Sequence, residues 1–215
     1  MRLVMPRLYV ILDAALVHGS VLELAEQLMD VGVRLLQYRD KAGTAARVLH
    51  TSKTLATMAK GRGATFFVND RPDIAYLAGA SGVHVGQDDL SADQARAIVG
   101  PDSWVGVSTH NPEQFRNAAA TSADYIAIGP IFTTTSKANP DPVVGTEMIT
   151  QLRSLTEKPL VAIGGIRLEQ AEAVLQAGAD SVAVISDILL AANPRERARQ
   201  FVKRLEAAKL PQRGA

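Results

Sequence analysis

Acidic side chains stand at the ends of two neighbouring short apolar runs in this 215-residue chain. The first run, Thr65–Val68, is followed by Asp70, and the second, Gly82–Val85, by Asp88 and Asp89. If both runs are strands of one strand–helix–strand unit, their carboxyl ends lie side by side and Asp70 approaches Asp89. Mg²⁺ takes oxygen ligands and often keeps one or two carboxylates while substrate phosphates complete its shell. The pair therefore predicts a magnesium site for a phosphorylated substrate. The alternative is that both aspartates are helix N-caps.

A second polar group lies at the end of an earlier run, Leu35–Arg39. Alternation along an extended strand points Gln37, Arg39 and Lys41 the same way, which brings an amide and two cations together. A planar guanidinium and an ammonium group suit the binding of a diphosphate. The alternative is that Arg39 forms a rim salt bridge with Asp40 or another nearby acid.

Hydroxyl groups follow two later apolar runs. Ser108 ends one of them, and we expect its hydroxyl to face a substrate. The role of His110 stays open, and His84, inside an apolar run, is expected to be a core or rim histidine. The longest non-periodic segment, from residue 130 to 145, carries a run of hydroxyls that ends in Lys137, which makes it the candidate lid.

Glycines follow the next apolar run, at Gly164 and Gly165, and a short segment follows the last run. Barrel enzymes often bind a monophosphate in this position, through backbone N–H groups and a helix N-terminus. The sequence thus predicts two anion pockets on opposite sides of one site.

Short apolar runs alternate with longer amphipathic ones from Leu8 onward, which predicts repeated strand–helix units and a parallel sheet. The expected strands are Leu8–Leu12, Leu35–Arg39, Thr65–Val68, Gly82–Val85, Trp104–Ser108, Tyr125–Gly129, Leu160–Gly164 and Ser181–Ile185. The expected helices are Val21–Val31, Ala45–Lys60, Arg71–Ala78, Asp93–Val99, Pro112–Ala120, Thr146–Leu155, Leu168–Ala177 and Pro194–Ala208. We therefore predict an α/β fold, a single (β/α)8 TIM barrel over residues 1–215, with its core at about 8–208 and a frayed tail at 210–215. An open doubly wound sheet is the alternative.

Composition excludes several classes of protein. A net charge of +1, from 23 basic and 22 acidic residues, predicts no general attraction to nucleic acid or to an anionic membrane. The absence of cysteine excludes disulfides, thiolate metal sites and a cysteine nucleophile. No signal peptide and no apolar run of about 20 residues is seen, so we expect a cytoplasmic protein. Homo-oligomer formation is left open by the sequence.

Taken together, these residues resemble the thiamine-phosphate synthase (thiamine-phosphate pyrophosphorylase) family over almost the whole chain. The matching motifs are Gln37-Tyr38-Arg39-Asp40-Lys41, Asn69-Asp70, Gly86-Gln87-Asp88-Asp89, Gly106-Val107-Ser108, Gly129-Pro130-Ile131-Phe132 with the hydroxyl run to Lys137, Ala162-Ile163-Gly164-Gly165-Ile166 and Val184-Ile185-Ser186. One departure is Thr133, where the family usually has proline, and a looser lid is the expected consequence.

The resemblance implies a transferase of thiamine biosynthesis. It would join hydroxymethylpyrimidine diphosphate to thiazole phosphate, with Mg²⁺ on Asp70 and Asp89. Catalysis would fall to Arg39, Lys41, Lys137 and Ser108. Matching positions place the pyrimidine diphosphate on Gln37, Tyr38, Arg39, Asp40, Lys41, Asn69, Ser108 and Lys137. They place the thiazole phosphate on Thr134, Thr135, Ser136, Gly165, Ile185 and Ser186. The alternatives are a thiazole tautomerase-like isomerase, which needs no diphosphate or metal, and a non-catalytic thiazole-phosphate binding module.

Overall fold

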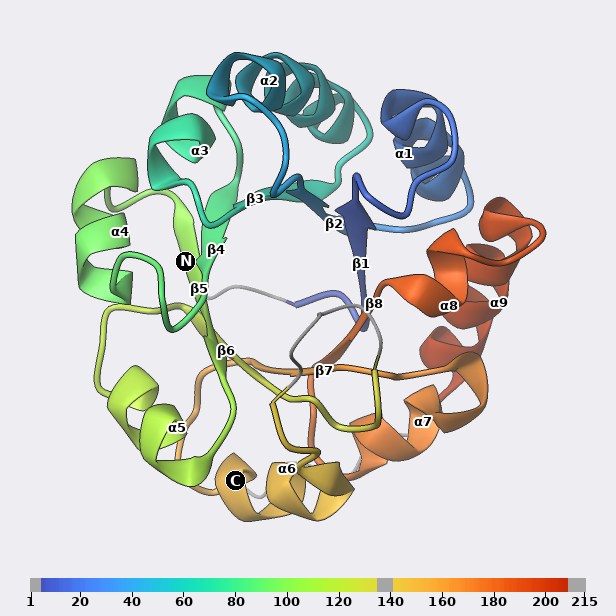
Figure 1. Ribbon diagram of the computed structural model, residues 1–215. Coiled ribbons are helices and arrows are strands. Elements are labelled where there is room, and N and C mark those ends of the chain that lie inside the picture. Colours follow the sequence, from blue (N-terminus) through green and yellow to red (C-terminus); the bar gives the residue numbers. More distant parts are fainter. Residues whose placement is uncertain (1–4, 135–140, 209–215) are drawn as a thin grey trace.

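Eight parallel strands form a closed barrel in the computed structural model, which describes residues 5–134 and 141–208 (Figure 1). The strands follow one another around the barrel in chain order, and pairing of β1 with β8 closes it. They are β1 (Leu8–Asp13), β2 (Leu35–Arg39), β3 (Thr65–Asn69), β4 (Gly82–Val85), β5 (Trp104–Thr109), β6 (Tyr125–Ile128), β7 (Leu160–Ile163) and β8 (Ser181–Val184). Closure confirms the predicted TIM barrel and excludes the open doubly wound sheet.

Helices surround the barrel on the outside (Figure 1). They are α1 (Val21–Asp30), α2 (Ala45–Gly61), α3 (Pro72–Ala78), α4 (Ala92–Val99), α5 (Pro112–Ala119), α6 (Gly145–Arg153), α7 (Leu168–Gln176), α8 (Ser186–Leu189) and α9 (Pro194–Ala207). The short helix α8 was not among the expected helices, because four residues are too few to show a period of 3.6. Within the described ranges, no helix combines the length and the hydropathy needed to cross a lipid bilayer.

Local signals explain where the helices begin and end. The side chains of Ser20, Thr44, Ser91, Asn111 and Asn193 each accept a hydrogen bond from the first turn of the helix that follows. Pro112 and Pro194 lie in first turns, as predicted, where the missing N–H removes no helical hydrogen bond. Gly79 ends α3 in the left-handed conformation at a φ of 64°.

Alternation along the strands divides the apolar core into two layers. Tyr9, Ile11 and Leu35 belong to a small cluster inside the barrel, with Phe67 and Tyr125. Their neighbours along the strands belong to the larger layer between strands and helices. Because side chains alternate with a period of two, the residues that follow Leu35 at even steps also face inward. This register brings Gln37 and Arg39 to the mouth of the barrel.

Candidate active site

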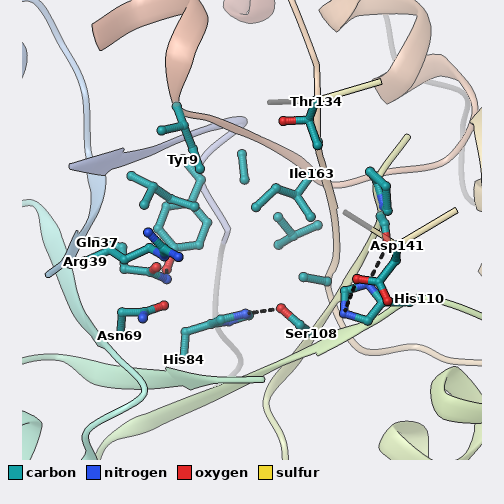
Figure 2. Close-up of a pocket in the computed structure, with 18 residues that line it drawn as sticks. Tyr9, Gln37, Arg39, Asn69, His84, Ser108, His110, Thr134, Asp141 and Ile163 are labelled. Carbon is teal, nitrogen blue, oxygen red and sulfur yellow. Dashed lines mark hydrogen bonds and ion pairs between the residues drawn. The ribbon is translucent and has the colours of Figure 1, made fainter. Parts of the chain in front are cut away.

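A pocket opens at the carboxyl ends of the strands (Figure 2). Six predicted site residues line it: Gln37, Arg39, Asn69, Ser108, Thr134 and Ile185. They come from β2, β3, β5 and the segments after β6 and β8, so the barrel brings together residues that are far apart in sequence. The apolar part of the lining includes Ile11, Val161 and Ile163.

Arg39 lies at the rim of this pocket and forms an ion pair with Asp13. The two residues are aligned partners in the pairing of β1 with β2. Asp13 is only 3% exposed, and its other carboxylate oxygen accepts a hydrogen bond from the N–H of Ala15 at 3.0 Å. The salt-bridge alternative for Arg39 is thus confirmed, with Asp13 rather than Asp40 as the partner. A guanidinium has five N–H donors, so the ion pair leaves donors for an anionic ligand.

Tyr38 and Asp40 face away from the pocket. Tyr38 is buried in the layer between strands and helices, and its hydroxyl donates to Asp40 at 3.0 Å. Asp40 also accepts from Arg47 of α2 at 2.9 Å. The contacts that the structure gives these two residues hold α2 against β2, and substrate binding by them stays a prediction.

Asp70 and Asp89 lie close together beside the pocket, at the ends of β3 and β4. Burial raises the pKa of the Asp89 carboxyl, and the neighbouring Asp70 raises it further. The N–H of Gly86 donates to the Asp89 carboxylate at 2.7 Å, which fixes that side chain. Lys41 forms an ion pair with Asp70. The expectation that the two carboxylates meet at one rim is confirmed.

Neither aspartate is a helix cap, so that alternative is wrong. The N-cap of α3 is Arg71 and the N-cap of α4 is Ser91. Asp70 instead occupies the left-handed region at a φ of 61°, which side chains other than glycine rarely adopt. Its N–H donates to the carbonyl of His84 at 2.7 Å, which ties the end of β3 to β4. Such a backbone conformation next to a pocket is typical of functional sites.

The two carboxylates suit a hard divalent cation. Burial is the first cause of the raised pKa of Asp89, and the neighbouring Asp70 adds to it. A cation between the two carboxylates would relieve their repulsion. In the described part of the chain, no group of three or more histidine, cysteine or acidic side chains gathers as a cation site. Two carboxylates are the number that Mg²⁺ commonly takes from a protein when substrate phosphates complete its coordination.

His84 is buried in the barrel and hydrogen-bonded at both ring nitrogens. Nδ1 lies 2.8 Å from the hydroxyl of Tyr125, and Nε2 lies 2.8 Å from the hydroxyl of Ser108. Figure 2 shows the contact with Ser108. Burial lowers the pKa of His84 to about 4, although the carboxylate of Asp89 opposes the shift. The ring is therefore neutral near pH 7, and the prediction of a satisfied core or rim histidine is confirmed.

The segment after β7 holds the loop after β6 in place. Ile131 and Phe132 donate backbone hydrogen bonds to Ile163 and Gly164 at 2.9 and 3.0 Å. Gly164 and Gly165 both have positive φ values, 99° and 64°. A Cβ atom on Gly165 would collide with the carbonyls of Phe132 and Thr133. Glycine is therefore required here, where backbone approaches backbone.

Three comparisons place this barrel among known proteins. A family model described as thiamine monophosphate synthase matches residues 8–188. A thiamine-phosphate synthase from Koribacter versatilis is 50% identical over 208 residues, which cover 94% of this chain and 97% of that protein. A second one, from Shouchella clausii, is 39% identical over 203 residues, covering 94% and 97%. The solved structure of a thiamine phosphate pyrophosphorylase from Pyrococcus furiosus superposes with a TM-score of 0.86 at 31% identity, covering 94% of this chain and 96% of that one.

The chain belongs to the thiamine monophosphate synthase family. It is thus an enzyme, a transferase of thiamine biosynthesis. The resemblance indicated by the sequence motifs is confirmed.

Gly165 and Ser186 adjoin the residues Gly164 and Ile185 that line the pocket, on the side expected for the thiazole phosphate. Ser186 begins α8, whose Asp187 is held by Arg197 at 2.8 Å. Three predicted site residues, Thr135, Ser136 and Lys137, lie outside the described residues, as does the tail from 210 to 215.

Sequence reasoning missed several residues at this site. Tyr9 lines the pocket and Asp13 holds Arg39. Asp13 ends the first apolar run, LYVILD, so its position at a strand end was a usable signal. Asp141 also lines the pocket, beside His110, whose role the sequence left open. Nε2 of His110 lies 3.5 Å from the Asp141 carboxylate, and Nδ1 lies 2.6 Å from the carbonyl of Gly129. No local pattern relates these last two residues.

Proposed function

We propose that this chain transfers the 4-amino-2-methylpyrimidin-5-ylmethyl group from its diphosphate ester to the ring nitrogen of a thiazole phosphate. The products are thiamine phosphate and diphosphate. One observation supports this activity above all. The carboxylates of Asp70 and Asp89 meet beside Lys41, next to the pocket that Arg39 lines. An enzyme that bound only a monophosphate would not need these four charged side chains.

Asp70 and Asp89 would hold Mg²⁺, which would neutralise charge on the diphosphate and make it a better leaving group. Arg39 and Lys41 would donate hydrogen bonds to the same group, with Lys137 as the third cation. Lys41 would exchange its ion pair with Asp70 for one with the substrate. Gln37, Asn69 and Ser108 would orient the substrate, because all three line the pocket.

The reaction follows from the leaving group. The bond between the exocyclic carbon and the diphosphate oxygen breaks, and the diphosphate leaves with the electron pair. The ring amino group of the pyrimidine donates electron density to the carbon left behind. Donors fixed around the diphosphate stabilise the charge that develops on it. The thiazole nitrogen then attacks the same carbon from within the pocket, and its proximity replaces a bimolecular encounter.

The thiazole phosphate would occupy the opposite side of the mouth. Its phosphate would bind near Gly165 and the start of α8, at Ile185 and Ser186, and the hydroxyls of Thr134, Thr135 and Ser136 would be further donors to it. The apolar residues Val161 and Ile163 of β7 also line the pocket. Such a surface suits two aromatic rings that must meet with water excluded.

A metal-dependent assay tests this function. Diphosphate release and thiamine phosphate formation are measured with both substrates, with Mg²⁺ or with EDTA, for the wild type and for Asp70→Asn. Asparagine tolerates the left-handed backbone at this position, so the change removes charge without adding strain. We expect activity to fall by at least about 100-fold, both with EDTA and in the variant.

Asp30→Asn is the matched control, because Asp30 is a half-exposed aspartate on the outer helix α1. It should keep the wild-type rate. If the wild type binds the thiazole phosphate but releases no diphosphate with Mg²⁺, the transferase activity is rejected in favour of an isomerase or a binding module.

A further inference from the structure

Five side chains from five strands form one chain of hydrogen bonds across the barrel. Gln37 Nε2 donates to the hydroxyl of Tyr9 at 2.7 Å, and the hydroxyls of Tyr9 and Tyr125 lie 3.2 Å apart. From Tyr125 the chain continues through the two ring nitrogens of His84 to Ser108, at 2.8 Å for each step. Figure 2 shows the last step, with Ser108 beside the pocket.

Counting the hydroxyl, amide and imidazole protons fixes the direction in which these hydrogen bonds are donated. With its Nε2 directed at Tyr9, the amide of Gln37 donates to that hydroxyl, so the Tyr9 proton needs another acceptor, and Tyr125 lies beside it. Tyr125 must then pass its own proton to Nδ1 of His84. Because Nδ1 is then an acceptor, the ring carries its proton on Nε2 and donates it to Ser108.

With Nε2 of Gln37 toward Tyr9, the opposite direction leaves a buried proton without an acceptor among these five side chains. If Ser108 donated to His84, then His84 would donate to Tyr125 and Tyr125 to Tyr9. Tyr9 would accept from both sides, and its own proton would have no place in the chain. Leaving such a buried donor unpaired is unfavourable, because it loses its hydrogen bond to water without gaining another.

We infer that this chain holds the Ser108 hydroxyl as a hydrogen-bond donor to the anionic substrate, with His84 and Tyr125 as positioning residues. The inference rests on the proposed function, since the acceptor would be an oxygen of the diphosphate. A serine 2.8 Å from a histidine resembles a nucleophile and its base. The direction of the chain assigns the opposite roles, because His84 gives a proton to Ser108 and does not take one.

The position of Tyr125 is fixed by packing as well as by hydrogen bonds. Its ring meets those of Phe67 and Tyr9 edge to face, with centroids 5.5 and 6.2 Å apart. Gly106 of β5 makes room for it, because a Cβ atom there would collide with the Tyr125 ring. The glycine of β5 is therefore part of the support for Ser108, two residues further along the same strand.

The tautomer of His84 gives a direct test that needs no turnover. Protein labelled with ¹⁵N-histidine is examined by NMR near pH 7, and the signals of His84 are assigned by their loss in His84→Gln. If that variant does not fold, replacement of each of the other three histidines in turn leaves the His84 signals in place. We expect the proton on Nε2, with Nδ1 as an acceptor. A proton on Nδ1, or on both nitrogens, overturns the inference.

A double-mutant cycle tests the effect on catalysis. Tyr125→Phe keeps the ring and removes the proton donated to His84, so kcat should fall about 10-fold with little change in KM. In the Ser108→Ala background the same change should have no further effect, because the group that it positions is gone. Equal losses in both backgrounds would overturn the inference. A wild type without activity would reject the proposed function, and the tautomer would still decide the direction of the chain.

Discussion

Arg39 and Lys41 are two cations with different surroundings, although both are expected to bind the diphosphate. The side chain of Arg39 is 22% exposed and that of its partner Asp13 is 5% exposed. For Lys41 and its partner Asp70 the corresponding values are 56% and 16%. Removing one member of a buried pair leaves an uncompensated charge, whereas an exposed pair adds little to stability.

At the scale of the residue, we therefore predict unequal losses of stability. Arg39→Ala should lower the free energy of unfolding by about 2 to 3 kcal/mol, because it leaves the buried carboxylate of Asp13 without its cationic partner. Lys41→Ala should lower it by less than about 1 kcal/mol. Chemical denaturation of the two variants and the wild type measures the difference.

Asp13→Asn in the Arg39→Ala background is the control. It removes the unpaired negative charge of Asp13 and should restore part of the lost stability. Similar losses for the two alanine variants would show that the carboxylate of Asp13 is not costly to leave unpaired.

The elements that carry the site are the segments after the strands. The loop after β6 is tied down at both ends, since Val144 donates a backbone hydrogen bond to Pro130 at 2.9 Å and Phe132 one to Gly164 at 3.0 Å. Gly165 lies directly against this loop. Gly63, between α2 and β3, has nearly the same φ, 62° against 64°, but a Cβ atom there meets no atom within 4 Å.

At the scale of the element, Gly165→Ala and Gly63→Ala form a matched pair. Each places a Cβ atom on left-handed backbone and should cost about 1 kcal/mol for that reason. Only Gly165→Ala also brings a Cβ atom against the carbonyls of Phe132 and Thr133, which displaces the loop after β6. We expect it to raise KM for the thiazole phosphate about 10-fold and to lower the melting temperature further than Gly63→Ala, which should leave the kinetics unchanged. Steady-state kinetics and thermal unfolding measure both effects, and equal behaviour of the two variants would contradict a role for the contact.

The interior of the barrel is partly polar, and this makes the stability of the whole molecule depend on pH. His84 lies among aromatic rings inside the closed sheet, stacked against Tyr125 with ring centroids 5.5 Å apart. Burial lowers the pKa of its imidazole from 6.5 to about 4 in the folded protein. Between these two values the unfolded chain binds a proton that the folded barrel does not, so stability falls as the pH falls through this range.

At the scale of the molecule, we predict that His84 lowers the free energy of unfolding by about 3 kcal/mol as the pH falls from 6.5 to 4, since each unit of pKa shift corresponds to about 1.36 kcal/mol. His84→Gln lacks this titration, so its deficit in stability relative to the wild type should shrink as the pH falls. Urea denaturation of both proteins without added metal, at steps across this range, measures the gap. Parallel curves would mean that the buried imidazole titrates normally.

Much of the fold was predictable because its signals are local. Each strand begins and ends within one residue of the expected bounds, since an apolar run ended by glycine, proline or a helix cap depends only on neighbouring residues. The approach of Asp70 to Asp89 was predictable as well, because a strand–helix–strand unit must be parallel and its carboxyl ends must adjoin. The helix caps at Ser91 and Asn111 are equally local, and the cap at Ser91 excludes that role for Asp89.

The amino-acid sequence by itself determined the strand–helix order, the alternation along each strand and the family motifs at the strand ends. Tertiary structure alone decided that Asp13 holds Arg39, that Tyr38 and Asp40 turn toward α2, and that a single chain of hydrogen bonds runs from Gln37 to Ser108. The physical reason is the closure of the sheet. Tyr9 and Tyr125 are 116 residues apart and come from strands that are not neighbours, so their hydroxyls meet only because the barrel places inward-facing side chains at the same height.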